Sequence, residues 1–440
     1  MSATIARPRS HALPLQPARH AEGTLLLPGS KSISNRALLL AALAQGRTQL
    51  HDVLDADDTR VMIAALRTLG IAITQDLPAR TVVVNGTAGA FLSASADLFL
   101  GNAGTAFRPL TAVLAMGEGA YALDGVARMR ERPIGDLVDA LRALGASIDY
   151  RGADGFPPLA IGRFTARNIH RVDVRGDVSS QFLSALLLAL PLHPAHAHAD
   201  LTINVTTPLV SRPYVEITTR LMRQFGVDVA TPDASTFVVP AGNGYASPHR
   251  LDVEGDASSA SYFLAAGVLG GGPVRVRGAG RASIQGDIAF ADVLAGMGAD
   301  IRFEDHAIEA RRGNRLAGGT IDCTAIPDAA MTLAMVALFA DGPMTLANIG
   351  SWRVKETDRI AAMATELAKL GAGVAQGGDW LRITPPDQWR HATIDTYDDH
   401  RMAMCFSLAV FGGIGVTIND PGCVDKTFPG YFDAFLKLVQ

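Results

Sequence analysis

The chain has 440 residues, a length at which one hydrophobic core usually gives way to two or more domains. Hydrophobic residues make up 48% and charged residues 19%, as in an ordinary folded protein, and a net charge of −4 argues against a nucleic-acid-binding chain. Three cysteines without a CxxC pair argue against a disulfide framework and a cysteine zinc site, and they fit a cytoplasmic location.

The first predicted helix follows an N-terminal arm. Residues 1–20 contain three arginines and no acid but lack the apolar stretch of a secretory signal. In "LPGSKSISNRALLLAALAQG", a lysine and three serines then precede an apolar run that predicts a buried helix. A helix start already carries partial positive charge, so Lys31 and Arg36 there indicate a site for an anion.

A repeat runs along the rest of the chain. Five amphipathic helices each end at a glycine that is followed by a short strand. Glycine there predicts a left-handed residue that closes the helix. These glycines, spaced 75, 81, 72 and 73 residues apart, are Gly70, Gly145, Gly226, Gly298 and Gly371.

A second set of helices has the same period and is apolar nearly all round, as buried helices are. They begin at "GSKSISNR", "GNAGTAFR", "GDVSSQFL", "GDASSASY", "PDAAMTLA" and "DDHRMAMC". Six units of roughly 70 residues, each with strands and two helices, predict an α/β fold with internal repetition. "YFDAFLKLVQ" resembles a sixth helix that lacks its following strand.

Two stretches carry alternative readings. Met402–Ile418 has no charged residue, but three glycines interrupt it, which favours a buried helix, a turn and a strand over a membrane span. The turn-rich passage Gly242–Asp256 is a plausible crossover between two domains of three units.

The starts of the buried helices share hydroxyl, amide and cationic side chains, which bind phosphates and carboxylates. Serine and aspartate are also ordinary caps, and capping alone explains Asp256, Ser258 and Ser259. Gln181, two places after the cap position, has no capping role. The arginines of "GVARMRERP" and the charges of "SWRVKETDR" are either functional or a solvated turn.

Several catalytic templates are missing from the sequence. There is no Walker motif, no GxGxxG after a strand and no HExxH. The histidines of "HPAHAH" are interpreted as a surface loop rather than a metal site. We therefore expect no metal and no organic cofactor.

Long motifs from about Gly23 onward occur in the order "LPGSKSISNRALLLAAL", "LFLGNAGTAFRPL", "RMRERPIGDLVDALRALGA", "GDVSSQFLSALL", "EGDASSASYFLAAG", "IPDAAMTLAM", "WRVKETDRIAAMATEL", "DDHRMAMCFSL" and "DKTFPGYF". In these motifs the chain resembles the 5-enolpyruvylshikimate-3-phosphate synthase family. The resemblance implies an α/β fold of two domains, each with three βαβαββ units and buried helices, and an active site in the interdomain cleft. On this basis we expect domain I to comprise residues 1–22 and 250–440, and domain II residues 23–249.

The resemblance also implies an activity. It is the transfer of the enolpyruvyl group of phosphoenolpyruvate to the 5-hydroxyl of shikimate 3-phosphate, with release of phosphate, on the route to chorismate and the aromatic amino acids. A cytoplasmic monomer inhibited by glyphosate is expected.

Site residues follow from the same motifs. Those implied for shikimate 3-phosphate are Lys31, Ser32, Arg36, Ser179, Ser180, Gln181, Ser211, Tyr214, Asp328, Ser351 and Lys355. Those implied for phosphoenolpyruvate are Lys31, Gly104, Arg128, Gln181, Arg359, Arg401 and Lys426.

Proton transfer is assigned by the resemblance to Asp328 and Glu356 with help from Lys31. We expect Asp328 to orient the 5-hydroxyl and Glu356 to exchange the second proton. Two positions depart from the family. Ser351 replaces the usual asparagine, and we expect its shorter side chain to reach the ligand through a bridging water. Asp398 stands where asparagine is expected and is interpreted as a tolerated cap.

Two alternatives stay open. The related transferase that acts on UDP-N-acetylglucosamine uses a loop cysteine, and "GVARMRERP" has none, while the three cysteines are expected to be buried. A catalytically silent polyanion-binding protein is the other, and the presence of Asp328, Lys355 and Glu356 counts against it.

Overall fold

The computed structural model describes residues 12–167, 169–242 and 244–440, and it divides the chain into two compact units. Unit 1 comprises the described residues up to Leu27 together with Asp256–Ser283 and Asp287–Gln440. Unit 2 comprises Pro28–Gly255 and Ile284–Gly286. These changeovers lie five and six residues after the expected ones at 22/23 and 249/250. Each unit has a core of its own.

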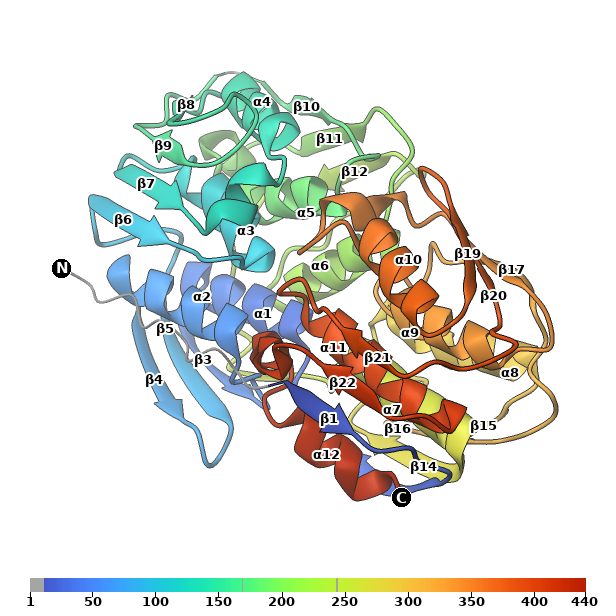
Figure 1. Cartoon of the computed structure of the whole chain (residues 1–440). Helices are drawn as coiled ribbons and strands as arrows, with labels where there is room; N and C mark the ends of the chain where they lie inside the picture. Colours follow the sequence, from blue (N-terminus) through green and yellow to red (C-terminus); the bar gives the residue numbers. More distant parts are fainter. Residues whose placement is uncertain (1–11, 168, 243) are drawn as a thin grey trace. The chain divides into compact units, whose positions relative to one another are not determined.

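Unit 2 contains three small sheets (Figure 1), each combining parallel and antiparallel pairs. The first has the order β13-β3-β5-β4, with β13 (Arg250–Asp252), β3 (Gln45–His51), β5 (Thr81–Thr87) and β4 (Ala72–Asp76). The second has the order β6-β7-β9-β8, with β6 (Ser95–Phe99), β7 (Ala120–Asp124), β9 (Leu159–Ile161) and β8 (Ile148–Tyr150). The third consists of β10 (Arg171–Val174), β11 (Leu201–Val205) and β12 (Thr236–Val239).

The helices of unit 2 are of two kinds. Three are buried on nearly every side: α1 (Lys31–Leu43), α3 (Gly104–Leu114) and α5 (Ser180–Ala189). Three bury one face: α2 (Asp57–Thr68), α4 (Gly135–Leu144) and α6 (Arg212–Gln224). The buried helices α3 and α5 pack on each other in the interior of the unit (Figure 1).

Unit 1 repeats this plan. Its sheets are β15-β16-β14-β2, β17-β18-β20-β19 and β1-β22-β21. The strands are β1 (Leu13–Leu15), β2 (Ala21–Leu26), β14 (Gly271–Arg277), β15 (Asp300–Phe303), β16 (Ala307–Arg311), β17 (Gly319–Asp322), β18 (Met344–Ala347), β19 (Gly373–Gln376), β20 (Leu381–Thr384), β21 (Ala392–Ile394) and β22 (Val416–Ile418). The buried helices are α7 (Ala257–Gly270), α9 (Ala330–Val336) and α11 (His400–Phe406), and the outer ones are α8 (Ala289–Met297), α10 (Arg359–Lys369) and α12 (Tyr431–Leu438).

Two strands lie at the points where the chain passes from one unit to the other. Strand β2 pairs in parallel with β14 of unit 1 and leads directly to α1 of unit 2. Strand β13 pairs in parallel with β3 of unit 2 and leads to α7 of unit 1. The two passages run side by side, because Ser30 N donates to Glu254 O at 2.8 Å and Gly29 forms a bridge with Gly255. A Cβ on Gly29 would lie only 2.0 Å from Asp52 O, so this approach requires glycine.

The predicted repeat is confirmed at the helix ends. All five glycines have left-handed φ, between +89° and +116°. The six predicted buried helices are also present, and Met402–Ile418 forms the end of α11, a 3₁₀ segment and β22. Within the described residues, no helix has the length and apolar character needed to cross a membrane.

The prediction of an N-terminal arm is wrong for the part of it that the structure describes. β1 pairs with β22 in an antiparallel arrangement, and β2 joins the sheet of β14, so both segments are built into unit 1. The helix α12 that appeared to lack a strand is followed by Val439, which bridges to Ala21. Residues 1–11 of the predicted arm lie outside the described residues.

Candidate active site

The predicted site residues divide between the two units. Unit 1 holds Asp328, Ser351, Lys355, Glu356, Arg359, Arg401 and Lys426. Unit 2 holds Lys31, Ser32, Arg36, Gly104, Arg128, Ser179, Ser180, Gln181, Ser211 and Tyr214. Each group has its own electrostatic character.

Asp328 is the centre of the unit 1 group. It lies just before α9, and its side chain is 13% exposed. Its Oδ1 accepts from Arg359 Nη1 at 2.9 Å and lies 3.6 Å from Lys355 Nζ, while Oδ2 accepts from Arg401 Nη2 at 2.8 Å. Burial acts to raise the pKa of Asp328, but Arg401, Lys355 and Arg359 outweigh it and hold that pKa well below its usual range. Asp328 is therefore an ionised carboxylate that three cations surround.

Arg359 connects this carboxylate to two more. It begins α10 and is 1% exposed. Besides Asp328, it donates through Nη2 to Glu356 Oε2 at 3.0 Å and through Nε to Asp399 Oδ2 at 2.7 Å. These three carboxylates raise the pKa of Arg359 despite its burial, so its charge is permanent.

Asp399 also closes the start of α11, where it accepts from the backbone N–H of Arg401 at 2.9 Å. The prediction that Asp398 is the cap is therefore wrong. Asp398 has a left-handed φ of +54°, as does Tyr397 before it. Both aspartates are good caps by residue type, and only the backbone conformation shows which of them takes this role.

A buried tryptophan fixes the loop that supplies Lys355 and Glu356. Trp352 is fully buried, and its Nε1 donates to Pro327 O at 2.7 Å, one residue before Asp328. Ser351 precedes it in the same 3₁₀ segment (Gly350–Val354) and is partly buried. Lys426 ends another 3₁₀ segment (Pro421–Lys426) and is 8% exposed.

The sequence reasoning missed Asp287. Its carboxylate accepts from Ser258 Oγ at the start of α7 and from Ala329 N at 3.4 Å, beside Asp328. Burial, followed by the charge of Asp328, raises the pKa of Asp287 to about 6. "QGDIAF" carries no signal for this role, because a single aspartate in a short turn is a common surface feature.

Lys31 of unit 2 has a carboxylate close to it. Lys31 Nζ lies 3.5 Å from Asp58 Oδ2, and the two side chains are 9% and 4% exposed. Asp58 comes from the first turn of α2, whereas the first turn of α1 has no acid of its own. This aspartate was not predicted, although acids in the first turn of a helix are common and stabilising.

Among the described residues, the hydrogen-bond partners of Arg36 are uncharged. It donates to Thr218 Oγ1 at 2.7 Å, to Ser32 O at 2.9 Å and to Tyr214 O at 3.4 Å. It is 6% exposed, and burial lowers its pKa to about 10. A buried cation without a carboxylate is costly unless an anion binds it, so Arg36 supports the predicted anion site.

Gly104 begins α3 between two buried arginines. A Cβ at this position would lie 2.8 Å from Arg132 Nη2 and 3.0 Å from Arg108 Nη1. Arg132 is 3% exposed and donates to the backbone and side-chain oxygens of Asn102. Arg128, the residue that the resemblance implies, pairs with Glu131 at 2.9 Å, and its side chain is 29% exposed. Arg132 is thus a further candidate beside Gly104, and the role of Arg128 stays a prediction.

The remaining predicted residues of unit 2 lie at two helix starts. Ser179 caps α5 by accepting from Gln181 N at 3.3 Å, and Ser180 is buried. Ser211 precedes α6, is 6% exposed and has a left-handed φ of +51° without capping the helix. Strain in a serine that makes no cap indicates a role for its hydroxyl elsewhere.

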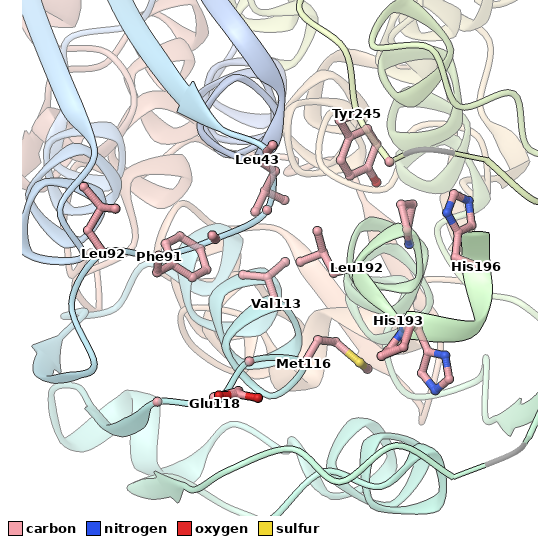
Figure 2. A pocket seen from close by; sticks show the side chains of 18 of the residues that line it. Leu43, Phe91, Leu92, Val113, Met116, Glu118, Leu192, His193, His196 and Tyr245 are labelled. Atoms are coloured by element: carbon pink, nitrogen blue, oxygen red, sulfur yellow. The ribbon is translucent and has the colours of Figure 1, made fainter. Parts of the chain in front are cut away.

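A cavity of about 760 Å³ lies at the other ends of the unit 2 buried helices and contains none of the predicted residues. Leu43, Val113 and Leu192, which end or follow α1, α3 and α5, surround it (Figure 2). His193 and His196 line it and are each 2% exposed, so the prediction of a surface loop is wrong for these two. Burial lowers the pKa of both imidazoles.

The cysteines are buried, as predicted. Burial raises the pKa of the Cys323 and Cys405 thiols to about 12, and it also raises that of Cys423. A thiol so difficult to ionise is a poor nucleophile. Among the described residues, no three histidine, cysteine or acidic side chains cluster as metal ligands would.

Comparison with known proteins shows the family to which the chain belongs. Residues 15–435 match the family model described as EPSP synthase (3-phosphoshikimate 1-carboxyvinyltransferase). A 3-phosphoshikimate 1-carboxyvinyltransferase of Cupriavidus taiwanensis is 60% identical over 97% of this chain and 99% of its own length. One of Thiobacillus denitrificans is 61% identical over 96% and 97%.

Two solved structures are similar in fold. An EPSP synthase from Acinetobacter baumannii superimposes with a TM-score of 0.77 at 26% identity, covering 97% of both chains. The enolpyruvyl transferase NikO from Streptomyces tendae gives a TM-score of 0.76 over 98% of both chains. At 20% identity, the second shows the fold alone.

Proposed function

Because the chain belongs to the EPSP synthase (3-phosphoshikimate 1-carboxyvinyltransferase) family, we propose that it transfers the carboxyvinyl group of phosphoenolpyruvate to the 5-hydroxyl of shikimate 3-phosphate. Phosphate is the second product. The observation that carries the proposal is the Asp328 carboxylate among Lys355, Arg359 and Arg401, with Glu356 on the same arginine.

The reaction needs two proton transfers, and unit 1 has two acids for them. In the addition step, Asp328 accepts the proton of the 5-oxygen, which bonds to C2 of phosphoenolpyruvate, while C3 gains a proton from Glu356 and becomes a methyl group. In the elimination step, the C2–O bond to phosphate breaks, the methyl group returns one proton to Glu356, and the phosphate leaves with the proton that Asp328 had accepted. Asp328 orients the 5-hydroxyl, and Glu356 exchanges the proton at C3.

The charge of Asp328 and the burial of Glu356 and Lys31 support these assignments. The low pKa of Asp328 makes it an acceptor for the 5-hydroxyl at neutral pH. Glu356 is 8% exposed and accepts from Arg359, which also donates to Asp328 and Asp399. Lys31 is assigned the assisting role because its side chain is buried at the start of α1.

Shikimate 3-phosphate is assigned mainly to unit 2. Arg36 and Lys31 supply positive charge, and Ser32, Ser179, Ser180, Gln181, Ser211 and Tyr214 supply polar groups near the starts of α1, α5 and α6. Amide hydrogens at a helix start add to the attraction for phosphate and carboxylate. Lys355, Ser351 and Asp328 complete the assignment from unit 1.

Phosphoenolpyruvate is assigned to Lys31, Gly104, Arg128, Gln181, Arg359, Arg401 and Lys426. Arg132 is added to this set because it is buried and lies close to Gly104. The Arg359 guanidinium is already oriented by Asp399 and Asp328, and that of Arg401 by Asp328 and the Tyr262 hydroxyl, so little rotational freedom is lost when they bind an anion.

Glyphosate, a small anion with a carboxylate and a phosphonate, is proposed to compete for the phosphoenolpyruvate residues. We also propose that the protein acts as a cytoplasmic monomer, since one chain supplies both groups of residues.

A phosphate-release assay tests the function. Phosphate should appear when both substrates are present, and neither phosphoenolpyruvate nor shikimate 3-phosphate alone should give it. Release with UDP-N-acetylglucosamine in place of shikimate 3-phosphate would instead assign the other transferase reaction. Binding of both ligands without release would indicate the silent polyanion-binding protein.

A further inference from the structure

A buried carboxylate of unit 1, Glu366, has no part in the proposed chemistry. It is 0% exposed and lies on α10 seven residues after Arg359, which places both on one face of the helix. Glu366 Oε1 accepts from the Tyr397 hydroxyl at 2.7 Å, and Oε2 accepts from Asp395 N at 3.1 Å and lies 2.7 Å from Lys369 Nζ. A fully buried carboxylate is retained only where such partners compensate its burial.

The segment that Glu366 holds is strained. Tyr397 and Asp398 both have a φ of +54°, in the left-handed region that non-glycine residues rarely occupy. For a bulky tyrosine this conformation persists only when its surroundings enforce it. Tyr397 is 42% exposed, so core packing restrains it little, and its hydroxyl contact to Glu366 holds the turn together with the hydrogen bond from Asp399 N to Thr396 O at 2.9 Å.

The strained turn ends at Asp399, which binds one arginine side chain of the proposed site and caps the helix that carries the other. Asp399 accepts from Arg359 Nε at 2.7 Å and from the backbone N–H of Arg401 at 2.9 Å. Arg359 and Glu366 therefore attach α10 to residues 395–399 at two points, two helical turns apart. If the turn relaxed, the Asp399 carboxylate would shift, so Arg359 would lose one of the carboxylates that orient it and α11 would lose its cap.

We propose that Glu366 and Tyr397 are positioning residues that hold a strained turn so that Asp399 orients the Arg359 side chain for phosphoenolpyruvate and caps the helix that carries Arg401. This inference rests on the proposed function, because it takes these arginines as the phosphoenolpyruvate ligands. Neither Glu366 nor Tyr397 contacts substrate in this account. Their effect reaches the ligand only through Asp399.

The test compares three variants with the wild type. Tyr397→Phe removes one hydroxyl and keeps the ring, so it should fold. We expect the KM for phosphoenolpyruvate to rise about tenfold, the equivalent of one hydrogen bond to a charged group, while the KM for shikimate 3-phosphate changes less than about twofold. Glu366→Gln keeps an acceptor for Tyr397 and should raise the same KM about threefold.

A double variant separates positioning from general stability. Adding Asp398→Gly to Tyr397→Phe removes one of the two left-handed penalties, so the KM for phosphoenolpyruvate should return to within about threefold of wild type. The control is Tyr121→Phe in unit 2, which also loses a buried hydroxyl hydrogen bond, to Ser93 O at 2.9 Å. It should lower the thermal midpoint and leave the two KM values in their original ratio.

Hydrogen exchange of residues 395–401 gives a readout that does not depend on turnover. Exchange should accelerate in Tyr397→Phe and slow again in the double variant. An equal rise in both KM values, unchanged exchange, or no recovery in the double variant would overturn the proposal. A wild type that releases no phosphate would overturn the proposed function instead, and the exchange comparison would still decide whether the turn is held by Glu366.

Discussion

The buried arginines of the unit 1 network and Arg36 of unit 2 differ in their partners. In unit 1, Arg359 and Arg401 meet Asp328, Glu356 and Asp399, so cations and carboxylates neutralise each other. In unit 2, where Lys31 has Asp58 beside it, the described partners of Arg36 are uncharged oxygens. A balanced network is suited to moving protons, whereas an uncompensated cation is suited to receiving an anion. One repeated fold thus supplies both roles through the residues at its helix starts.

The largest effect is expected in the balanced network of unit 1. Asp328→Asn should reduce kcat by about 10³-fold or more, because the acceptor for the 5-hydroxyl proton is lost. Steady-state phosphate release measures this, with circular dichroism to verify folding. A folded variant with near-normal kcat would remove Asp328 from the chemistry.

The next largest effect is expected in the free energy of unfolding, which should distinguish Arg359 from Arg36. Arg359→Met would leave Asp399 buried without its arginine, so the free energy of unfolding should fall by about 3 to 5 kcal/mol. Arg36→Met removes a cation that lacks a carboxylate and should cost less than about 1 kcal/mol without ligand, yet weaken shikimate 3-phosphate binding about 100-fold. Urea unfolding and calorimetry provide the two measurements. Equal destabilisation by both variants would contradict the comparison.

Arg132 and Arg128, two arginines of the same loop, are compared next for their effect on phosphoenolpyruvate. Arg132→Ala should raise the KM for phosphoenolpyruvate about 30-fold because a charge-assisted contact is lost. Arg128→Ala should raise it less, by about threefold, because the Arg128 pair with Glu131 is partly exposed. An unchanged KM in Arg132→Ala would remove Arg132 from the site and leave Arg128 as the arginine of this loop that binds phosphoenolpyruvate.

Asp287 predicts a pH dependence of stability. Its pKa of about 6 in the folded protein is above its value in the unfolded chain, so its contribution is fully present below about pH 4 and is lost as the pH rises through 6. Asp287→Asn should therefore raise the free energy of unfolding by about 2 kcal/mol at pH 8 and have little effect at pH 4. Urea titrations at the two pH values measure this. A variant that is less stable at pH 8 would show that the ionised carboxylate is needed.

The smallest effect is expected at Gly104. In Gly104→Ala, the new methyl group would press on the ends of Arg132 and Arg108, which can move by a few tenths of an ångström. The KM for phosphoenolpyruvate should rise about tenfold, and the glyphosate concentration for half-inhibition should rise by more. Inhibition curves at fixed phosphoenolpyruvate measure both, and unchanged inhibition would separate glyphosate from this position.

Local patterns made the repeated helices predictable. Gly70 and its four counterparts need a left-handed backbone, which leaves a mark in the sequence, and the apolar helices show their burial directly. No such local signal exists for the pairing of β2 with β14 or of β13 with β3, because pairing between segments more than 200 residues apart depends on the whole fold.

Side-chain choices within a motif were harder. In "RMRER" and "DDHR" the residue types alone did not show that Arg132 lies beside Gly104 or that Asp399, rather than Asp398, caps α11. These differences depend on backbone direction over one or two residues. Partners from other segments, such as Asp58 and Asp287, were equally inaccessible because each is an ordinary aspartate until the fold brings it to Lys31 or Asp328.

The most direct measurement is the reaction in deuterium oxide with both substrates. Addition of a solvent proton to C3, followed by loss of a proton from the resulting methyl group, should place deuterium in the methylene group of the carboxyvinyl product as phosphate is released. Mass spectrometry of that product should show the label in the wild type. Phosphate release with an unlabelled methylene group would contradict the account.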